Sequence, residues 1–251
     1  MNETVFITGA TSGIGKATAE LFANHKFKLI LCGRRQERLV HLKEQLGALT
    51  TVHTLNFDVR DKDAVKKAID SLPEEFSKIS ILINNAGNAH GLDTIQEGSI
   101  TDWDAMLDIN VKGLLYVSKA IIPKMITQNK GHIINIGSTA GKEVYPRGNV
   151  YCASKHAVDA INQGMRIDLN QHGIRVGALN PGLVETEFSQ VRFKGDDERA
   201  ENVYKGFQAL KPEDIADIIL FTVTRPYHVN IADLVVMPTA QASSTIVNKT
   251  L

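Results

Sequence analysis

A phenol and an ammonium group stand four residues apart in the stretch GNVYCASKHA, where Tyr151 and Lys155 lie among small, apolar residues typical of a helix. Residues at positions i and i+4 of a helix share one face, so we expect these two side chains to lie close together. A nearby positive charge favours the phenolate, which predicts that Lys155 lowers the pKa of Tyr151 from about 10 towards neutral pH. Tyr151 would then serve as a general acid or base.

Two further polar residues extend this set. Ser138 follows the predicted strand GHIINIG and can donate a hydrogen bond to a carbonyl oxygen. Asn110 lies in the middle of the long helical stretch 101–128, where its side chain competes with backbone hydrogen bonds, and we interpret it as a water site that kinks the helix. The Tyr-x-x-x-Lys spacing alone occurs by chance in many helices, so the catalytic interpretation depends on Ser138 and on the glycine-rich turn.

That turn is TGATSGIGKATAELF, in which Gly9, Gly13 and Gly15 lead from the first predicted strand directly into a helix. Glycines let the backbone approach a phosphate, and the free N–H groups at the start of the helix stabilise the anion. The spacing is G-x-x-x-G-x-G and departs from the G-x-G-x-x-G fingerprint. The alternative is that these glycines only turn a strand into a helix.

Arginines follow the second predicted strand, in LILCGRRQER, where an NAD enzyme would carry a carboxylate for the ribose. Arg34 and Arg35 stand there instead. A guanidinium can bind a phosphate through two parallel hydrogen bonds, so the pair favours NADP over NAD. The alternative is a solvated helix face.

Polar and small residues also end the next two strands, in NFDVRD and INNAG. Ligands of parallel sheets bind outside the carboxyl ends of the strands, so these residues should border one crevice. Asp58 would accept a hydrogen bond from an adenine amino group or would belong to a helix cap near Asp61. Asn85 would contact the cofactor or tie neighbouring strand ends together.

Short β-branched runs alternate with helical patterns along the chain. The pattern predicts an α/β fold, a doubly wound Rossmann-type seven-stranded parallel sheet with helices on both faces. We expect a single domain over residues 1–251 and a lid at about 184–210, because residues 192–206 are polar and charged. The predicted strands are 4–8, 28–32, 51–56, 79–84, 131–137, 174–180 and 232–238; the predicted helices include 15–25, 36–47 (closed by Gly47), 62–72, 101–128 and 151–172, with another starting near Pro212.

Composition excludes several classes of partner. The 28 basic and 28 acidic side chains cancel, which favours neither nucleic acid nor an anionic membrane. Two distant cysteines show no metal-ligand or disulfide pattern, so we expect no metal and a cytoplasmic setting. No apolar stretch is long enough to cross a membrane. A small molecule is the expected ligand.

Together these motifs resemble the short-chain dehydrogenase/reductase family, and the resemblance covers essentially the whole chain. It implies the cofactor NADP, a homotetramer and the catalytic residues Asn110, Ser138, Tyr151 and Lys155. The cofactor-binding residues that it implies, beside Arg34, Arg35, Tyr151 and Lys155, are Thr8, Gly9, Ser12, Gly13, Ile14, Gly15, Asp58, Val59, Asn85, Ala86, Gly87, Pro181, Gly182, Val184 and Thr186.

Within that family the chain looks most like the NADP-dependent 3-hydroxy acid dehydrogenases of the L-serine and malonic semialdehyde type, through stretches such as CGRRQERL, GNVYCASK and HVNIADLVVMP. The resemblance implies that Tyr151 exchanges a proton with the substrate oxygen while a hydride moves between the nicotinamide and the same carbon. Ser138 would position that oxygen, and Asn110 would hold a water.

A hydroxy acid also needs a cation for its carboxylate. Arg147 and Arg192 are the candidates, with His90 a third, and Arg192 is preferred because a residue of a lid closes over substrate. Two alternative functions stay open. One is reduction of another carbonyl, such as a ketone, a sugar or a 3-oxoacyl thioester. The other is a non-catalytic NADPH-binding sensor, which the intact Ser138, Tyr151 and Lys155 disfavour.

Overall fold

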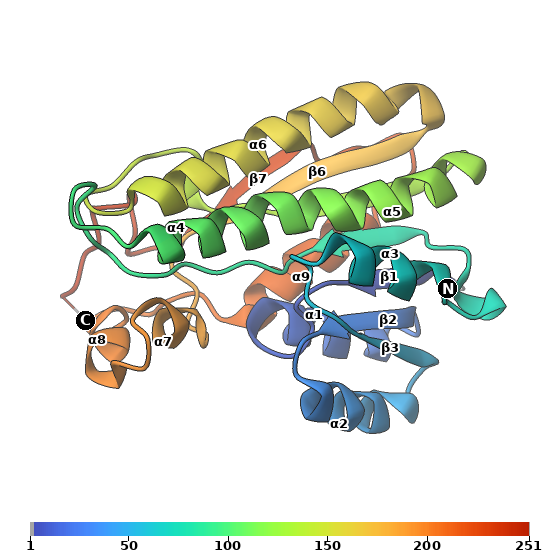
Figure 1. Cartoon of the computed structure of the whole chain (residues 1–251), viewed down its shortest axis with the longest axis horizontal. Helices are drawn as coiled ribbons and strands as arrows, with labels where there is room; N and C mark the ends of the chain where they lie inside the picture. The colour runs from blue at the N-terminus through green and yellow to red at the C-terminus, as the bar shows by residue number, and fades with distance from the viewer. Residues whose placement is uncertain (1–2, 251) are drawn as a thin grey trace.

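A seven-stranded parallel sheet forms the centre of the protein, in the order β3-β2-β1-β4-β5-β6-β7. The computed structural model describes residues 3–250 (Figure 1). All seven predicted strands are present within these residues, so the predicted sheet is confirmed. Their bounds are β1 Thr4–Ile7, β2 Lys28–Gly33, β3 Val52–Asn56, β4 Ile81–Asn84, β5 Gly131–Ile136, β6 Ile174–Pro181 and β7 Asp233–Val236.

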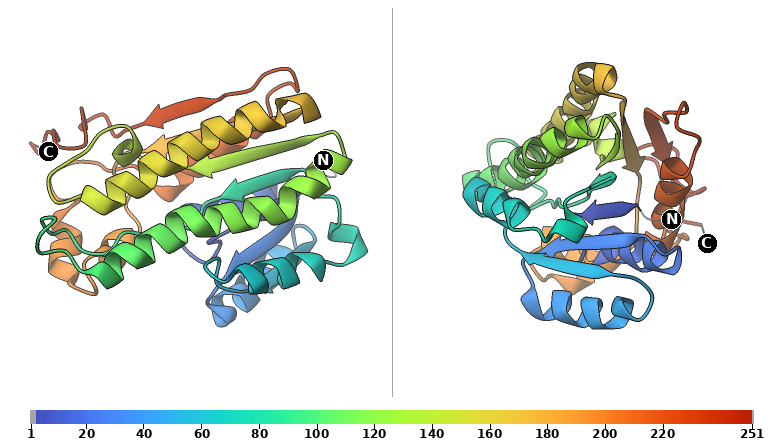
Figure 2. Two further views of the ribbon diagram at one scale, coloured as in Figure 1. Left: turned by 45° about the horizontal axis from the view of Figure 1, so that its top comes forward. Right: turned by 90° about the vertical axis from the view of Figure 1, so that its right-hand side faces the viewer.

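Helices cover both faces of the sheet, as the end-on view in Figure 2 shows. Successive residues of a strand point to opposite faces of the sheet. One layer of helices packs against the face that carries Val5 and Ile7, and the other packs against the face that carries Phe6. The first layer comprises α1 Gly13–Asn24, α2 Gln36–Gly47 and α9 Pro212–Val223, and the second comprises α3 Lys62–Asp70, α5 Leu114–Thr127 and α6 Asn149–Leu169.

The winding of the sheet reverses at β1, which pairs with β2 on one side and β4 on the other. The loops that leave these strands therefore separate and open a crevice at their carboxyl ends, where doubly wound folds bind ligands. Two short helices, α7 Phe188–Arg192 and α8 Asp197–Asn202, lie at this end of the molecule (Figure 1). The polar segment expected as a lid is therefore partly helical.

One predicted helix, 101–128, is interrupted in the structure. It consists of α4 Ile100–Leu107, a π-helical turn Asp108–Gly113 that contains Asn110, and α5. A π turn holds an extra residue, so the distortion that we expected at Asn110 is present in this form.

Helix ends agree with the sequence in one case and not in another. The Asp61 carboxylate accepts hydrogen bonds from the backbone of Asp63 and Ala64 and caps α3, as expected. The expectation that Gly47 forms the cap of α2 is wrong. Gly47 is the last helical residue and Ala48 follows as the cap with ordinary right-handed backbone angles, so the turn does not require a glycine.

Within residues 3–250 no helix combines the length and the apolar character needed to span a membrane.

Candidate active site

A cavity of about 450 Å³ opens at the carboxyl ends of the strands, within the range typical of small-molecule sites. It brings together most of the residues singled out in the sequence. Thr8, Gly15 and Asn110 lie behind its wall, and Arg147 borders a smaller adjoining pocket. The predicted residues that line the cavity are Gly9, Ser12, Gly13, Ile14, Arg34, Arg35, Asp58, Val59, Asn85, Ala86, Gly87, Ser138, Tyr151, Lys155, Pro181, Gly182, Val184, Thr186 and Arg192.

The glycine turn forms one end of the cavity. Gly9 and Gly13 adopt left-handed backbone angles, with φ of 65° and 50°, which other residues adopt only with strain. A Cβ atom on Gly15 would lie 2.3 Å from the carbonyl oxygen of Gly9, so only glycine fits there. Ser12 precedes α1 without capping it through its side chain, which leaves the first N–H groups of the helix for a ligand. These features fit a dinucleotide phosphate.

A set of hydrogen bonds joins the ends of β1 and β4 beneath this turn. The Thr8 hydroxyl accepts hydrogen bonds from the backbone N–H groups of Asn85 and Ala86, at 3.0 and 2.9 Å. The Asn85 amide donates in return to the carbonyl oxygens of Thr8 and Gly9, at 2.9 and 3.2 Å. Of the two interpretations of Asn85, tying the strand ends together is therefore the one that its side chain fulfils, and the loop is braced from below.

The two arginines lie at the far wall of the cavity. Arg35 donates to the hydroxyls of Thr11 and Ser12, at 3.1 and 2.7 Å. Arg34 lies 3.6 Å from the carboxylate of Asp58, which does not cap a helix. Burial acts to raise the pKa of Asp58, but hydrogen bonds from Arg60 outweigh it and lower that pKa, so the carboxylate is ionised. The guanidinium groups of Arg34 and Arg35 and the carboxylate of Asp58, a hydrogen-bond acceptor, therefore line this part of the cavity.

Tyr151 and Lys155 are both buried at the bottom of the cavity, 8% and 7% exposed. Burial raises the pKa of Tyr151, and Tyr145 adds to the rise, whereas the nearby Ser138 hydroxyl and the Arg192 guanidinium lower it in part. Lys155 does not offset this rise. Its ammonium donates to the carbonyl oxygen of Ile136 at 3.0 Å, and burial lowers its own pKa to about 8.

The expectation that Lys155 by itself brings the Tyr151 pKa towards neutrality is therefore wrong for the protein alone. Spacing along the helix indicated which side chains share a face but not how completely that face is desolvated, and desolvation disfavours both charged forms. In the protein alone Tyr151 is protonated at neutral pH, which is the form of a general acid.

Asn110 is almost fully buried in the π turn, and its side chain binds protein groups. Its amide donates to the carbonyl oxygen of Asn88 at 2.8 Å and to the Ser154 hydroxyl at 3.0 Å, and its oxygen accepts from the N–H of Asn88 at 2.9 Å. This side chain is a clamp on the loop after β4, and the water expected at Asn110 stays a prediction. A Cβ atom on Gly87 would lie 3.0 Å from the side-chain oxygen of Asn110 and 3.6 Å from the Lys155 nitrogen. The Asn110 clamp therefore sets the wall of the cavity beside Lys155.

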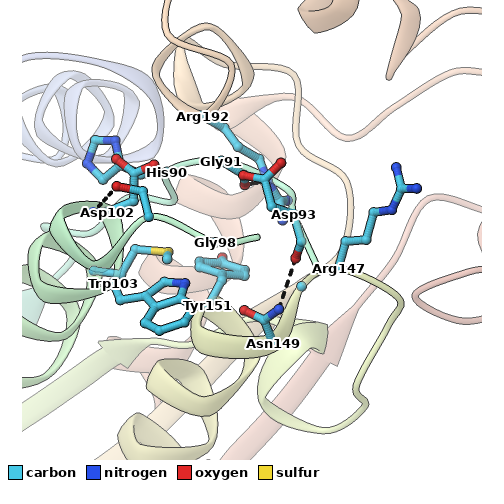
Figure 3. A pocket seen from close by; sticks show the side chains of 13 residues that line it. His90, Gly91, Asp93, Gly98, Asp102, Trp103, Arg147, Asn149, Tyr151 and Arg192 are labelled. Atoms are coloured by element: carbon cyan, nitrogen blue, oxygen red, sulfur yellow. Dashed lines mark hydrogen bonds between the residues drawn. The ribbon is translucent and has the colours of Figure 1, made fainter. Parts of the chain in front are cut away.

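Arg192, the last residue of α7, reaches over the ring of Tyr151. It donates to the Tyr145 hydroxyl at 2.8 Å and to the Gly91 carbonyl at 3.3 Å, and its guanidinium carbon lies 5.4 Å from the ring centres of both Tyr145 and Tyr151. Figure 3 shows Arg192 among the residues around Tyr151, whereas the side chain of Arg147 points away from them. His90 borders the adjoining pocket, where burial lowers its pKa and keeps it neutral.

Among the lining residues that the sequence did not indicate, three make contacts that shape the site. Tyr145 holds Arg192 and has no motif of its own. Glu187 accepts a hydrogen bond from Arg35, which is distant along the chain. Gln241 accepts from the N–H of Leu183 at 2.9 Å and brings the C-terminal segment to the cavity. Tertiary pairing of this kind leaves no local sequence signal.

The model of the family described as short chain dehydrogenase matches residues 3–197 of the chain. The chain belongs to this family. It is therefore an oxidoreductase, and the glycine turn, the Ser138 hydroxyl and the Tyr151/Lys155 pair occupy the crevice of that enzyme fold.

Two characterised relatives of this short-chain dehydrogenase are similar over nearly their whole length. The NADP-dependent 3-hydroxy acid dehydrogenase YdfG of Escherichia coli (strain K12) is 46% identical over 239 residues, 95% of this chain and 96% of that protein. Sulfoacetaldehyde reductase 2 of Chromohalobacter salexigens is 45% identical over 245 residues, 97% of each chain.

Solved structures agree with this assignment. The closed form of serine dehydrogenase complexed with NADP+ is 45% identical and superposes with a TM-score of 0.93, over 97% of this chain and 98% of that one. Serine dehydrogenase from Escherichia coli is 40% identical, with a TM-score of 0.83 over 95% and 99% of the two chains. The predicted family and fold are confirmed.

Proposed function

We propose that this short-chain dehydrogenase transfers a hydride between NADP and the hydroxyl or carbonyl carbon of a small 3-hydroxy acid, of the L-serine or 3-hydroxypropionate/malonic semialdehyde type. The observation that carries the proposal is the Arg192 guanidinium over the ring of Tyr151, because it puts a cation beside the acid/base group. Relatives named as 3-hydroxy acid dehydrogenase, serine dehydrogenase and sulfoacetaldehyde reductase support it, since each of these names implies a substrate with an anionic group.

NADP fits the cavity. The glycine turn and the start of α1 would hold the pyrophosphate, Arg34 and Arg35 the 2′-phosphate, and Asp58 with Val59 the adenine. Lys155 would hold a ribose from below, and the segment of Pro181, Gly182, Val184 and Thr186 would hold the nicotinamide. When bound, this cofactor supplies or accepts the hydride.

The chain's own residues handle the proton. In reduction the neutral phenol of Tyr151 donates its proton to the carbonyl oxygen as a hydride reaches the carbon, which leaves an alcohol and a phenolate. In oxidation the phenolate takes the hydroxyl proton back. Ser138 and Arg192 favour the phenolate form, and the Ser138 hydroxyl is close enough to the phenol to position the same oxygen.

Arg192 is the group that we assign to the substrate carboxylate. Its contact with Tyr145 fixes the plane of the guanidinium, and two parallel hydrogen bonds to a carboxylate are the geometry that this group favours. Arg147 is exposed and points away from Tyr151, so it is the weaker candidate (Figure 3). Segment 184–210, which carries Arg192, would act as the lid.

We also infer a homotetramer in the cytoplasm, with Asn110 as a positioning residue of the catalytic set. Exposed apolar side chains on α4 and α5, Leu107 and Leu115, support an interface on these helices. The chain would form one domain over residues 1–251.

A substrate and cofactor panel tests the function. We expect kcat/KM with NADP+ to be highest for 3-hydroxypropionate and L-serine, and to fall for the uncharged alcohols of similar size, with NADP+ preferred over NAD+. Sulfoacetaldehyde and malonic semialdehyde should be compared in reduction, because a guanidinium binds sulfonate as well as carboxylate. Equal efficiency for charged and uncharged substrates would indicate the alternative, reduction of a ketone, a sugar or a 3-oxoacyl thioester, and binding of NADPH without any turnover would indicate a sensor.

A further inference from the structure

Glu187, a residue of the proposed lid, contacts two arginines at the wall of the cavity assigned to the cofactor. One of its oxygens accepts a hydrogen bond from Arg35 at 2.8 Å, and the other accepts one from Arg38 at 2.7 Å. Glu187 borders the same cavity as Arg35 and immediately precedes α7, the helix that ends at Arg192. A single short helix is thus held to the cofactor wall at its first turn and to Tyr145 at its last residue.

Arg35 uses three of its five N–H donors in this state. Its Nε and Nη2 atoms donate to Thr11 and Ser12, which belong to the glycine turn, and its Nη1 atom donates to Glu187. One N–H of Nη1 and one of Nη2 remain, so a phosphate that binds them would share the guanidinium with the Glu187 carboxylate. Of the partners of Arg35, Glu187 is the one that carries a negative charge, and a carboxylate beside a phosphate repels it.

The contact with Glu187 is also exposed to solvent, which makes it weak. The side chains of Arg35, Arg38 and Glu187 are all 40–48% exposed, and exposed ion pairs contribute little free energy. A phosphate with up to two negative charges and three acceptor oxygens would outcompete the carboxylate for two guanidinium groups.

Resting on the proposed function, we propose that Glu187 mimics the 2′-phosphate of NADP in the ligand-free enzyme and is displaced from Arg35 and Arg38 when that phosphate binds. Displacement frees the first turn of α7, so cofactor binding is coupled to the position of Arg192 over Tyr151. Glu187 thereby lowers the affinity for the 2′-phosphate. Arg38 becomes a further residue of the 2′-phosphate site.

Binding of two nucleotides that differ only in this phosphate tests the proposal without catalysis. Adenosine 2′,5′-bisphosphate and 5′-AMP are titrated by calorimetry into the wild type, Glu187→Gln and Glu185→Gln. Glu185 is exposed and two residues away, so its substitution makes the same change in net charge without touching the arginines. We expect Glu187→Gln to bind the bisphosphate about threefold to tenfold more tightly, in keeping with the loss of exposed ion pairs, and 5′-AMP unchanged.

Three results would overturn the proposal: an unchanged or weaker affinity of Glu187→Gln for the bisphosphate, an equal gain for both nucleotides, or the same gain in Glu185→Gln. A wild type that does not prefer the bisphosphate over 5′-AMP would instead refute the NADP assignment itself. The two failures are thus distinguishable.

Limited trypsin digestion tests the coupling to the lid. Lys194 and Lys205 follow α7 and α8 and provide cleavage sites within the segment. We expect ligand-free Glu187→Gln to be cleaved there several times faster than the wild type or Glu185→Gln, and the bisphosphate but not 5′-AMP to raise the wild-type rate. Identical cleavage rates in the wild type and Glu187→Gln would overturn the coupling.

Discussion

The guanidinium of Arg192 lies over the ring of Tyr151, with 5.4 Å between the arginine Cζ atom and the ring centre. The residue assigned to the substrate's charge and the residue assigned to its proton are therefore neighbours. A ligand that contacts both must carry its anionic group only a few bonds from the reacting carbon, which a 3-hydroxy acid does.

Replacing Arg192 tests whether its charge, and not only its packing, is needed for the substrate. In Arg192→Ala we expect kcat/KM for 3-hydroxypropionate to fall about tenfold to a hundredfold, as charged hydrogen bonds are lost, while an uncharged alcohol of similar size changes little. Arg147→Ala is the matched control and should leave both substrates nearly unaffected. Steady-state kinetics with the two substrates measures the ratio, and an equal loss for both would remove Arg192 from the substrate site.

Replacing Tyr151 tests the proton transfer. Tyr151→Phe should abolish turnover and leave NADPH affinity, measured by fluorescence titration, within about twofold, because the hydroxyl serves the chemistry more than the binding. Measurable turnover in this variant would refute the acid/base assignment.

The raised pKa of Tyr151 predicts different pH profiles for the two directions. Reduction needs the protonated phenol, so its rate should stay level through neutral pH. Oxidation needs the phenolate, so its rate should rise with pH, by up to tenfold per unit. Initial rates between pH 6 and 10 provide the measurement, and parallel profiles in both directions would contradict it.

Asn110 should matter for stability and for catalysis. Asn110→Leu removes partners from the buried N–H and carbonyl of Asn88, which we expect to lower the free energy of unfolding by about 3 kcal/mol. Asn110→Asp keeps the acceptor for the Asn88 N–H and should lose less. Urea denaturation measures the free energy of unfolding of both variants. A fall in kcat that is larger than the change in KM in Asn110→Asp would show that the residue positions the wall beside Lys155, because simple unfolding does not produce that difference.

His132 predicts a loss of stability in acid. Its ring is buried in β5, neither nitrogen has a partner among the described residues, and burial with nearby Arg175 lowers its pKa to about 3. The unfolded chain takes up a proton near pH 6.5 while the folded one does not, so stability falls below that pH by up to about 1.4 kcal/mol per unit. His132→Leu should flatten this part of the curve, and urea denaturation at pH 5 and pH 7 compares the two slopes. Equal slopes would mean that other groups cause the acid sensitivity.

Local sequence patterns were sufficient for the sheet and the glycine turn. The strands read as β-branched runs because both of their faces are covered, and Gly9 and Gly13 stand where the backbone turns left-handed. The Tyr151/Lys155 pair follows from helical spacing alone.

What could not be predicted depends on tertiary contacts. Glu187 meets Arg35 only because the segment after β6 folds back over the end of β2, and Tyr145 holds Arg192, which lies 47 residues further along the chain. The pKa of Tyr151 depends on burial by several elements at once, which spacing within one helix does not report. The cap at Ala48 needs no special residue and so leaves no signal.

The π-helical turn Asp108–Gly113 divides one long helix into two parts, α4 and α5, whose buried sides face different neighbours. Before it, Met106 of α4 packs with Ala89 and Tyr151, and after it, Val117 and Ile121 of α5 pack beneath the sheet. An uninterrupted α-helix repeats every 3.6 residues and would keep a single stripe along its length. Deleting one residue of this turn would therefore rotate α4 about the helix axis relative to α5. Met106 could then no longer pack beside Tyr151 while Val117 and Ile121 keep their places against the sheet.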